Sequence, residues 1–142
     1  MDLRQITPEL SVSPQITPED LPDLAAQGFR VVINNRPDAE VGPDEDGAAM
    51  QAAAAAAGME YRAIPFVPGQ VTQTMVDAQA EALALPGRKI AYCRSGNRST
   101  VLWALTEAGT TPADSLLQTA AEAGYDLSGV RPMIDALAAR KG

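Results

Sequence analysis

Apolar residues along the chain gather in short runs that are separated by longer stretches of helix-forming composition. The run Phe29–Asn34 is rich in β-branched residues, and the shorter runs at 59–64 and 88–92 also predict strands, with Leu10–Ser13 as a short leading strand. Helices are expected over six ranges: 18–27, 47–57, 73–84, 99–108, 112–123 and 130–140.

Polar and glycine residues mark the limits of these elements. Thr17 stands before a proline and two acidic residues, which is typical of a helix start, whereas Gly28, Gly58 and Gly87 each follow a helical stretch. Helix and strand therefore alternate, and this order predicts a three-layer α/β/α fold with a mainly parallel central sheet. The polar stretch 36–47 is a loop within one domain that spans residues 1–142.

Two residue counts restrict the chemistry. The chain has no histidine, so Ser-His-Asp and Cys-His catalysis and histidine-ligated zinc are excluded, and we expect neither a metal nor another cofactor. Its single cysteine, Cys93, cannot form an intrachain disulfide. A net charge of −7 argues against nucleic acid as a partner. Without a long apolar stretch we expect no membrane span, and we expect a cytoplasmic protein.

The segment around Cys93 is the most informative part of the sequence. A strand ends at Tyr92 and a helix is expected from Ser99, and between them lie Arg94, Ser95, Gly96, Asn97 and Arg98. A strand–loop–helix turn of this kind directs backbone N–H groups toward one point, where they bind anions. Arginine guanidinium groups strengthen such a site, and the combined positive potential favours the thiolate form of a cysteine. We predict that Cys93 is a nucleophile assisted by Arg98, although a buried, unreactive thiol is the plainer alternative.

Four residues outside this loop are expected near the pocket. Arg36 and Asp38 follow the strand 29–34, and Phe66 and Val67 follow the strand 59–64. The ends of parallel strands meet at one edge of a sheet, where open α/β proteins place their ligands. Asp38 and the nearby Glu40 have a second interpretation, in which they form ion pairs with Arg36 or Arg94. Ser99 is expected either to cap the helix or to contact the thiol, and Asn97 to shape the turn.

The segment CRSGNRS resembles the active-site loop of rhodanese-type sulfurtransferases and, less closely, that of cysteine-dependent phosphatases. Protein tyrosine and dual-specificity phosphatases have Cys-X5-Arg, usually after a histidine, whereas this chain has Cys-X4-Arg after Tyr92. Over about residues 3–135 the chain is similar to a bacterial family, the phosphatase-like domain of β-lactamase-hydrolase-like proteins, also described as a sulfur transferase. The resemblance is carried by Ser13–Gln15, Gly28–Asn34, Arg36–Asp38, Glu40, Ile64-Pro65, Tyr92–Gly96, Leu102-Trp103 and Ala123–Asp126. It implies a dual-specificity-phosphatase-like fold.

Three functions remain open at this point. Residues 65–72 correspond to the phosphatase segment that carries the acid for the leaving group, and they contain no Asp or Glu. Transfer of sulfane sulfur through a Cys93 persulfide needs no such acid, so it is our first hypothesis, with phosphoester hydrolysis through a phosphocysteine second. A non-catalytic module that binds an anion or a partner is third. The expected partner is a small sulfur-containing or phosphorylated substrate, or a protein that handles persulfides.

Overall fold

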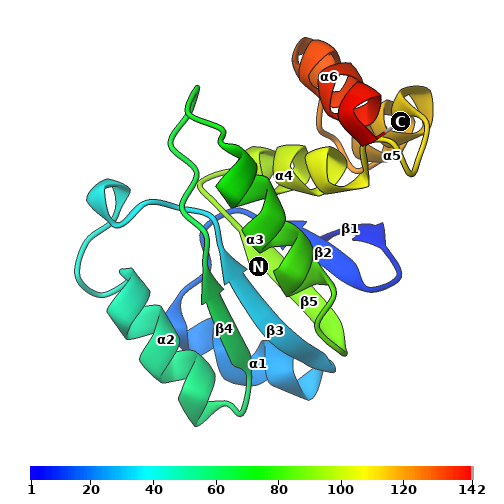
Figure 1. Cartoon of the computed structure of the whole chain (residues 1–142). Coiled ribbons are helices and arrows are strands. Elements are labelled where there is room, and N and C mark those ends of the chain that lie inside the picture. The colour runs from blue at the N-terminus through cyan, green and yellow to red at the C-terminus, as the bar shows by residue number, and fades with distance from the viewer. Residues whose placement is uncertain (142) are drawn as a thin grey trace.

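A five-stranded sheet in the order β1-β2-β5-β3-β4 forms the centre of the molecule (Figure 1). The computed structural model describes residues 1–141. Its strands are β1 (Arg4–Thr7), β2 (Leu10–Ser13), β3 (Phe29–Asn34), β4 (Glu60–Ala63) and β5 (Arg88–Tyr92). The strands β2, β5, β3 and β4 run parallel to one another, and only β1 is antiparallel, next to β2. The predicted mainly parallel sheet is therefore confirmed.

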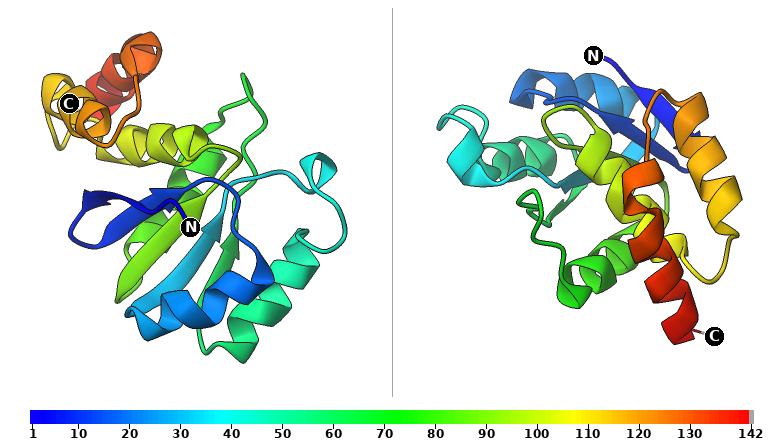
Figure 2. Two further views of the ribbon diagram at one scale, coloured as in Figure 1. Left: turned by 180° about the vertical axis from the view of Figure 1, so that it is seen from behind. Right: turned by 90° about the horizontal axis from the view of Figure 1, so that it is seen from above.

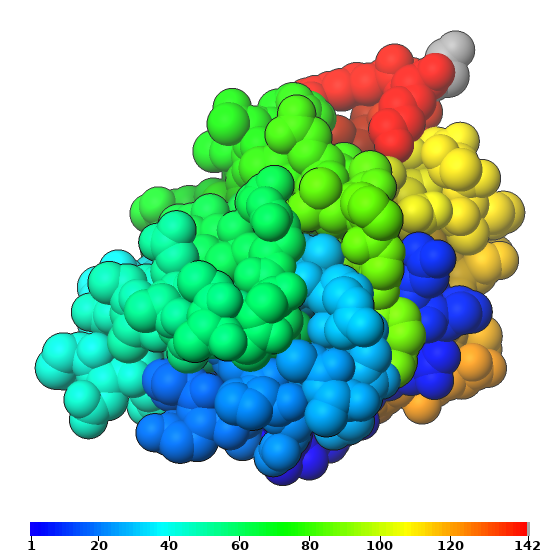
Figure 3. Space-filling view, turned by 90° about the horizontal axis from the view of Figure 1, so that it is seen from below, coloured from blue at the N-terminus to red at the C-terminus, as the bar shows by residue number. Residues whose placement is uncertain are grey.

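Helices cover both faces of this sheet (Figure 2). On one face lie α1 (Leu21–Ala26) and α2 (Gly47–Ala56), which are neighbours at the surface in Figure 3. On the other face lie α3 (Gln73–Leu83) and α4 (Asn97–Glu107), and α5 (Ala113–Glu122) and α6 (Arg131–Lys141) pack against α4. Three short 3-10 turns complete the set: η1 (Pro18–Asp20), η2 (Asp38–Glu40) and η3 (Ser128–Val130). The predicted three-layer arrangement is confirmed.

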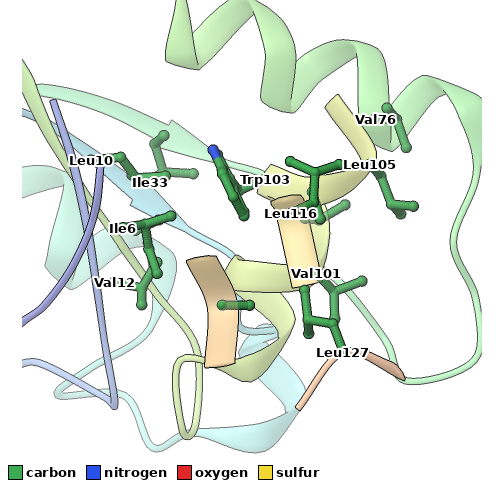
Figure 4. Close-up of a cluster of buried hydrophobic side chains, with 14 of the residues drawn as sticks. Ile6, Leu10, Val12, Ile33, Val76, Val101, Trp103, Leu105, Leu116 and Leu127 are labelled. Atoms are coloured by element: carbon green, nitrogen blue, oxygen red, sulfur yellow. The ribbon is translucent and has the colours of Figure 1, made fainter. Parts of the chain in front are cut away.

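Alternation along the strands divides the core into two clusters. In β3, Val32 packs with the residues of α1 and α2, whereas Val31 and Ile33 face the cluster formed with α3 and α4. This is the pattern expected of strands that are covered on both faces. Figure 4 shows the larger cluster, in which Trp103 of α4 lies on the side of Leu10 and Ile33 of the strands and Leu105 on the side of Val76 of α3.

The helix α4 is buried along most of its length. Its residues Ser99–Leu105 are all buried, because the sheet, α3 and the outer helices surround it. A helix covered on all sides is held firmly, since each fully buried leucine contributes about 1.5–3 kcal/mol. The first turn of α4, which follows Cys93, is therefore fixed by the core.

The start of α4 and the presence of β1 differ from the sequence expectation by more than the ends of the other elements do. The helix α4 begins at Asn97 rather than at Ser99, because Gly96 adopts φ +92° and becomes its N-cap. The strand β1 was not predicted, because its segment Arg4–Thr7 is largely polar; it forms a hairpin with β2. Across residues 1–141, no helix has the length and apolar character needed to cross a membrane.

Candidate active site

Cys93 lies directly after β5, at the carboxyl edge of the parallel strands. Its backbone N–H donates to the carbonyl of Ser13 (3.4 Å), and Asn35 donates to the carbonyl of Tyr92 (2.9 Å), so the ends of β2, β3 and β5 are joined at this edge. Cys93 is a free thiol with no exposed surface. The predicted strand–loop–helix turn thus puts the sulfur at the floor of the loop, beneath the segments that follow β3 and β4.

The loop directs a backbone donor at this sulfur. The N–H of Gly96 donates to the Cys93 Sγ (3.1 Å), in a conformation that its positive φ allows. The carbonyl of Gly96 points into the helix, where it accepts from the Thr100 N–H (3.1 Å) and Oγ1 (2.8 Å). The N–H groups of Arg94 and Ser95 make no hydrogen bond within residues 1–141. Together with the N–H groups of Arg98 and Ser99, which have no acceptor within their own helix, they offer donors for an anion.

Arg98 lies in the first turn of α4, and its guanidinium group is held from two sides. Its Nη1 and Nη2 donate to the two carboxylate oxygens of Glu40 (3.0 and 2.7 Å), and Nη1 also donates to the carbonyl of Phe66 (2.7 Å). A guanidinium group has five N–H donors, so within residues 1–141 these contacts leave the Nε–H and one Nη2–H free. Those two point in the same direction and form the side fork that binds two oxygens of a phosphate.

The guanidinium group of Arg98 lies beside the thiol. Hydrogen bonding with Glu40 is the main cause that raises the pKa of Arg98, and the charge and hydrogen-bonding capacity of Cys93 raise it further. The Cys93 sulfur, the Gly96 N–H and the guanidinium group of Arg98 are therefore neighbours. An oxyanion held by Arg98 would have its central atom next to the sulfur, which is the arrangement that a nucleophilic cysteine requires.

Glu40 is the residue that orients Arg98. The hydrogen bond from Arg98 is the main cause that lowers the pKa of Glu40, and Arg36 contributes as well. Arg36 donates to the Glu40 side chain (3.4 Å), to its carbonyl (3.1 Å) and to Gln15 (3.0 Å). The expected pairing of Glu40 with Arg36 is thus present, but Arg94 is exposed and forms no ion pair within the described chain. The sequence did not indicate Arg98 as a partner of Glu40, because 58 residues separate the two.

Three of the residues expected at the pocket have other places. Asp38 accepts a hydrogen bond from the N–H of Gly47 (2.8 Å), so it stabilises the turn before α2 and does not reach the pocket. Val67 is 41% exposed, so it does not form a buried wall, because the chain turns outward after Phe66. Arg36 approaches Arg98 only through Glu40. Phe66 is buried and contributes its carbonyl oxygen rather than its ring to the site.

The polar residues of the loop also differ from expectation. Ser99 does not cap α4, because the helix begins two residues earlier, and its buried hydroxyl makes no hydrogen bond to Cys93 or to another group in residues 1–141. The Ser95 hydroxyl accepts from the Asn97 N–H (3.3 Å), which fits the expected role of Asn97 in the turn.

Tyr125 is a site residue that sequence analysis did not identify. Its hydroxyl donates to the carbonyl of Ser95 (3.0 Å), although 30 residues separate the two. No local pattern indicates such a contact, and only the presence of Tyr125 among the residues of the resemblance pointed to it. Elsewhere, no three His, Cys, Asp or Glu side chains gather as a metal site within residues 1–141.

Comparison with known families decides what kind of domain carries this site. Residues 2–110 match the family described as "Beta-lactamase hydrolase-like protein, phosphatase-like domain". The chain belongs to this family. Among curated relatives, this phosphatase-like domain is 32% identical over 130 residues to a β-lactamase hydrolase-like protein of Xylella fastidiosa, covering 89% of the chain and 30% of that protein. A relative from Agrobacterium fabrum is 35% identical over 105 residues, covering 73% of the chain and 24% of the relative. The domain thus spans less than a third of these relatives.

Solved structures show the same phosphatase-like fold. A candidate phosphatase from Neisseria meningitidis superposes with a TM-score of 0.83 at 27% identity, covering 96% of this chain and 99% of its own. A second one, from Shewanella putrefaciens, gives a TM-score of 0.72 at 26% identity, covering 98% and 87% of the two chains. TpbA of P. aeruginosa, at 16% identity and a TM-score of 0.71, covers 99% of this chain and 90% of its own, and it shows the fold alone.

Proposed function

We propose that this domain is a cysteine-dependent hydrolase of phosphate monoesters. The observation that carries the proposal is that the Gly96 N–H donates to the Cys93 sulfur, while Arg98, whose side fork is free, lies beside this thiol. Two oxygens of a phosphoryl group fit that fork, and the free N–H groups of Arg94 and Ser95 are available to the third. The phosphatase-like fold of the relatives supports this function over sulfur transfer.

The proposed reaction has two displacement steps. The Cys93 thiolate attacks phosphorus, an S–P bond forms, and the P–O bond breaks with its electron pair on the leaving oxygen. Water then attacks the phosphocysteine, loses a proton to solvent, and the S–P electron pair returns to sulfur. Because Cys93 has no exposed surface, the atoms that cover the sulfur have to shift before a substrate can reach it.

The site is poor in acids that could protonate a leaving group. Residues 65–72 contain no carboxyl group, and Glu40 is committed to Arg98 with a lowered pKa. A Glu40 that stays ionised cannot donate a proton near neutral pH. The proposed substrates are therefore esters whose leaving group departs as an anion, such as aryl phosphates.

This shortage of acids also favours a second candidate, sulfane-sulfur transfer. In that reaction the Cys93 thiolate attacks the outer sulfur of a donor such as thiosulfate, a new S–S bond forms, and sulfite leaves with the electron pair of the broken S–S bond. Sulfite leaves as a stable anion, so this step needs no proton donor. The Cys93 persulfide would pass its sulfur to an acceptor thiol, on a small molecule or on a protein that handles persulfides.

Two parallel assays on one preparation separate these functions. p-Nitrophenyl phosphate is expected to release nitrophenol with wild-type protein and not with Cys93→Ser, whereas thiosulfate is expected to leave the mass of the protein unchanged. A gain of one sulfur atom on Cys93, without phosphate release, would establish sulfur transfer instead. If the protein does neither, the domain only binds anions or a partner. Cys93→Ser is matched in size to the native residue, so lost activity reflects the lost thiolate.

A further inference from the structure

The hydroxyl of Tyr125 and the sulfur of Cys93 are hydrogen-bonded to opposite sides of one peptide unit, the one that joins Ser95 to Gly96. Tyr125 donates to the carbonyl oxygen of Ser95 (3.0 Å), and the N–H that follows this carbonyl, on Gly96, donates to the Cys93 Sγ (3.1 Å). In a trans peptide the C=O and the N–H point in opposite directions within one rigid plane. The orientation of the carbonyl therefore determines whether the N–H meets the sulfur.

The alternative orientation of this peptide would oppose the chemistry. If the Ser95–Gly96 peptide turned over, its carbonyl oxygen would face the sulfur, and a negative dipole end next to the thiolate would destabilise it. Glycine tolerates both orientations, because it populates positive and negative φ about equally. Gly96 alone therefore cannot select the orientation that supports a thiolate.

We propose that Tyr125 is a positioning residue that holds the Ser95–Gly96 peptide with its N–H directed at Cys93. This inference rests on the proposed thiolate role of Cys93. Tyr125 lies beyond residue 110, where the match to the family model ends. The phenol of Tyr125 packs directly against Gly96. Any side chain at position 96 would therefore collide with it. The tyrosine thus restrains the loop both by a hydrogen bond and by shape.

Tyr125 is itself held by the first strand. The guanidinium group of Arg4 in β1 lies over the tyrosine ring, 5.3 Å from its centre, and its Nη1 donates to the carbonyl of Ala123 (3.0 Å). Asp2 accepts from Arg4 (3.2 and 3.4 Å) and keeps it in place. Burial raises the pKa of Tyr125, so the phenol keeps the proton that it donates to Ser95. The hairpin β1–β2, far from Cys93 in the sequence, is thus connected to the loop.

Removal of the single hydroxyl tests the proposal. Tyr125→Phe keeps the ring beneath Arg4 but loses the hydrogen bond to Ser95. The matched control is Tyr61→Phe on β4, where the phenol accepts from the Asn34 side chain (3.1 Å). Because Cys93 is the only cysteine, the rate of alkylation by iodoacetamide, followed by intact mass, reports on this thiol alone. The charged groups around it are Arg98, with Glu40 behind it, the exposed Arg94, and Tyr125 with Arg4 and Asp2.

Tyr125→Phe is expected to slow alkylation about three- to tenfold near pH 7, the loss that one hydrogen bond represents, with a smaller deficit as the pH rises. The deficit shrinks because high pH forms the thiolate in either loop orientation. Tyr61→Phe is expected to keep the wild-type rate at every pH. Equal rates for Tyr125→Phe and wild type, with thermal unfolding showing both folded, would overturn the positioning role. A wild-type thiol that is unreactive near neutral pH would instead remove the proposed function.

Discussion

Replacement of Glu40 by glutamine removes the charge that orients Arg98 while it keeps the shape of the side chain. In the native protein the two carboxylate oxygens of Glu40 accept from the Nη1 and Nη2 groups of Arg98 (3.0 and 2.7 Å). Glutamine keeps one acceptor oxygen and presents an NH2 group where the second oxygen was. One donor of Arg98 then faces another donor, so the guanidinium group turns away from the place that it holds beside Cys93.

The exposure of the Arg98–Glu40 pair determines how much Glu40→Gln should lower the free energy of unfolding. The side chain of Arg98 is 12% exposed and that of Glu40 is 31% exposed, so the pair is partly shielded from water. Exposed pairs contribute about 0.2–1 kcal/mol, and hydrogen bonds to charged groups contribute about 1.5–3 kcal/mol. We therefore expect Glu40→Gln to lower the free energy of unfolding by about 1–2 kcal/mol, or the melting temperature by about 3–8 °C for a chain of this size.

The stability difference should depend on pH in one direction. Because folding lowers the pKa of Glu40, its contribution is present above the ordinary carboxyl value of about 4.3. It is lost as the pH falls through the lowered folded-state pKa. Wild type and Glu40→Gln should thus differ most above about pH 5 and converge in more acidic buffer. Denaturant unfolding at a series of pH values measures this convergence.

The effect on activity should exceed the effect on stability. A misdirected Arg98 fork no longer stabilises the charge on the transferred group, so kcat/KM for p-nitrophenyl phosphate should fall about ten- to a hundredfold. Glu9→Gln is the control, because Glu9 pairs with buried Lys89 (3.3 Å) at the opposite end of β5. That variant should lose stability but keep kcat/KM. A Glu40→Gln variant with wild-type kcat/KM, or a Glu9→Gln variant equally impaired, would refute the orienting role of Glu40.

Three further predictions follow from the loop and its supports. Gly96→Ala should reduce kcat/KM at least about a hundredfold, because the new methyl group meets the Tyr125 phenol and a positive φ is strained; steady-state kinetics on folded protein test this. Aryl phosphates should be hydrolysed with a rate that falls steeply as the leaving phenol becomes more basic, and a flat dependence would reveal a leaving-group acid. Leu102→Ala in α4, where Leu102 is fully buried, should lower the free energy of unfolding by about 2–5 kcal/mol in urea titrations, whereas a loss below about 1 kcal/mol would contradict the packing.

Local signals in the sequence were enough to predict the layers of the fold and the central part of the site. The β-branched run at Phe29–Asn34 and the glycines after the helices define the alternation of helix and strand. Strand, cysteine, glycine and arginine follow one another within a few residues around Cys93, so their proximity in the structure is a consequence of chain connectivity. The start of α4 was misplaced because Gly96 caps it through backbone conformation, which leaves no side-chain signature.

The contacts that orient the site could not be predicted, because they join distant segments. Glu40 could pair with any arginine that the fold brings near, and the acidic loop around it offered Asp38 as an equal candidate. In the fold, Asp38 accepts from the Gly47 N–H in the turn before α2, and Glu40 is the acidic residue that pairs with Arg98. The contact of Tyr125 with Ser95 likewise depends on how the segment after α5 packs against the loop.

In the proposed reaction Cys93 takes a phosphoryl group from the substrate onto its sulfur. Rapid acid quenching of wild-type protein during turnover of p-nitrophenyl phosphate, followed by intact-mass and peptide mass spectrometry, tests this most directly. We expect a gain of one phosphoryl group located on Cys93, absent from Cys93→Ser. Turnover that continues in Cys93→Ser, or a Cys93 that gains only sulfur from thiosulfate and never a phosphoryl group, would contradict it.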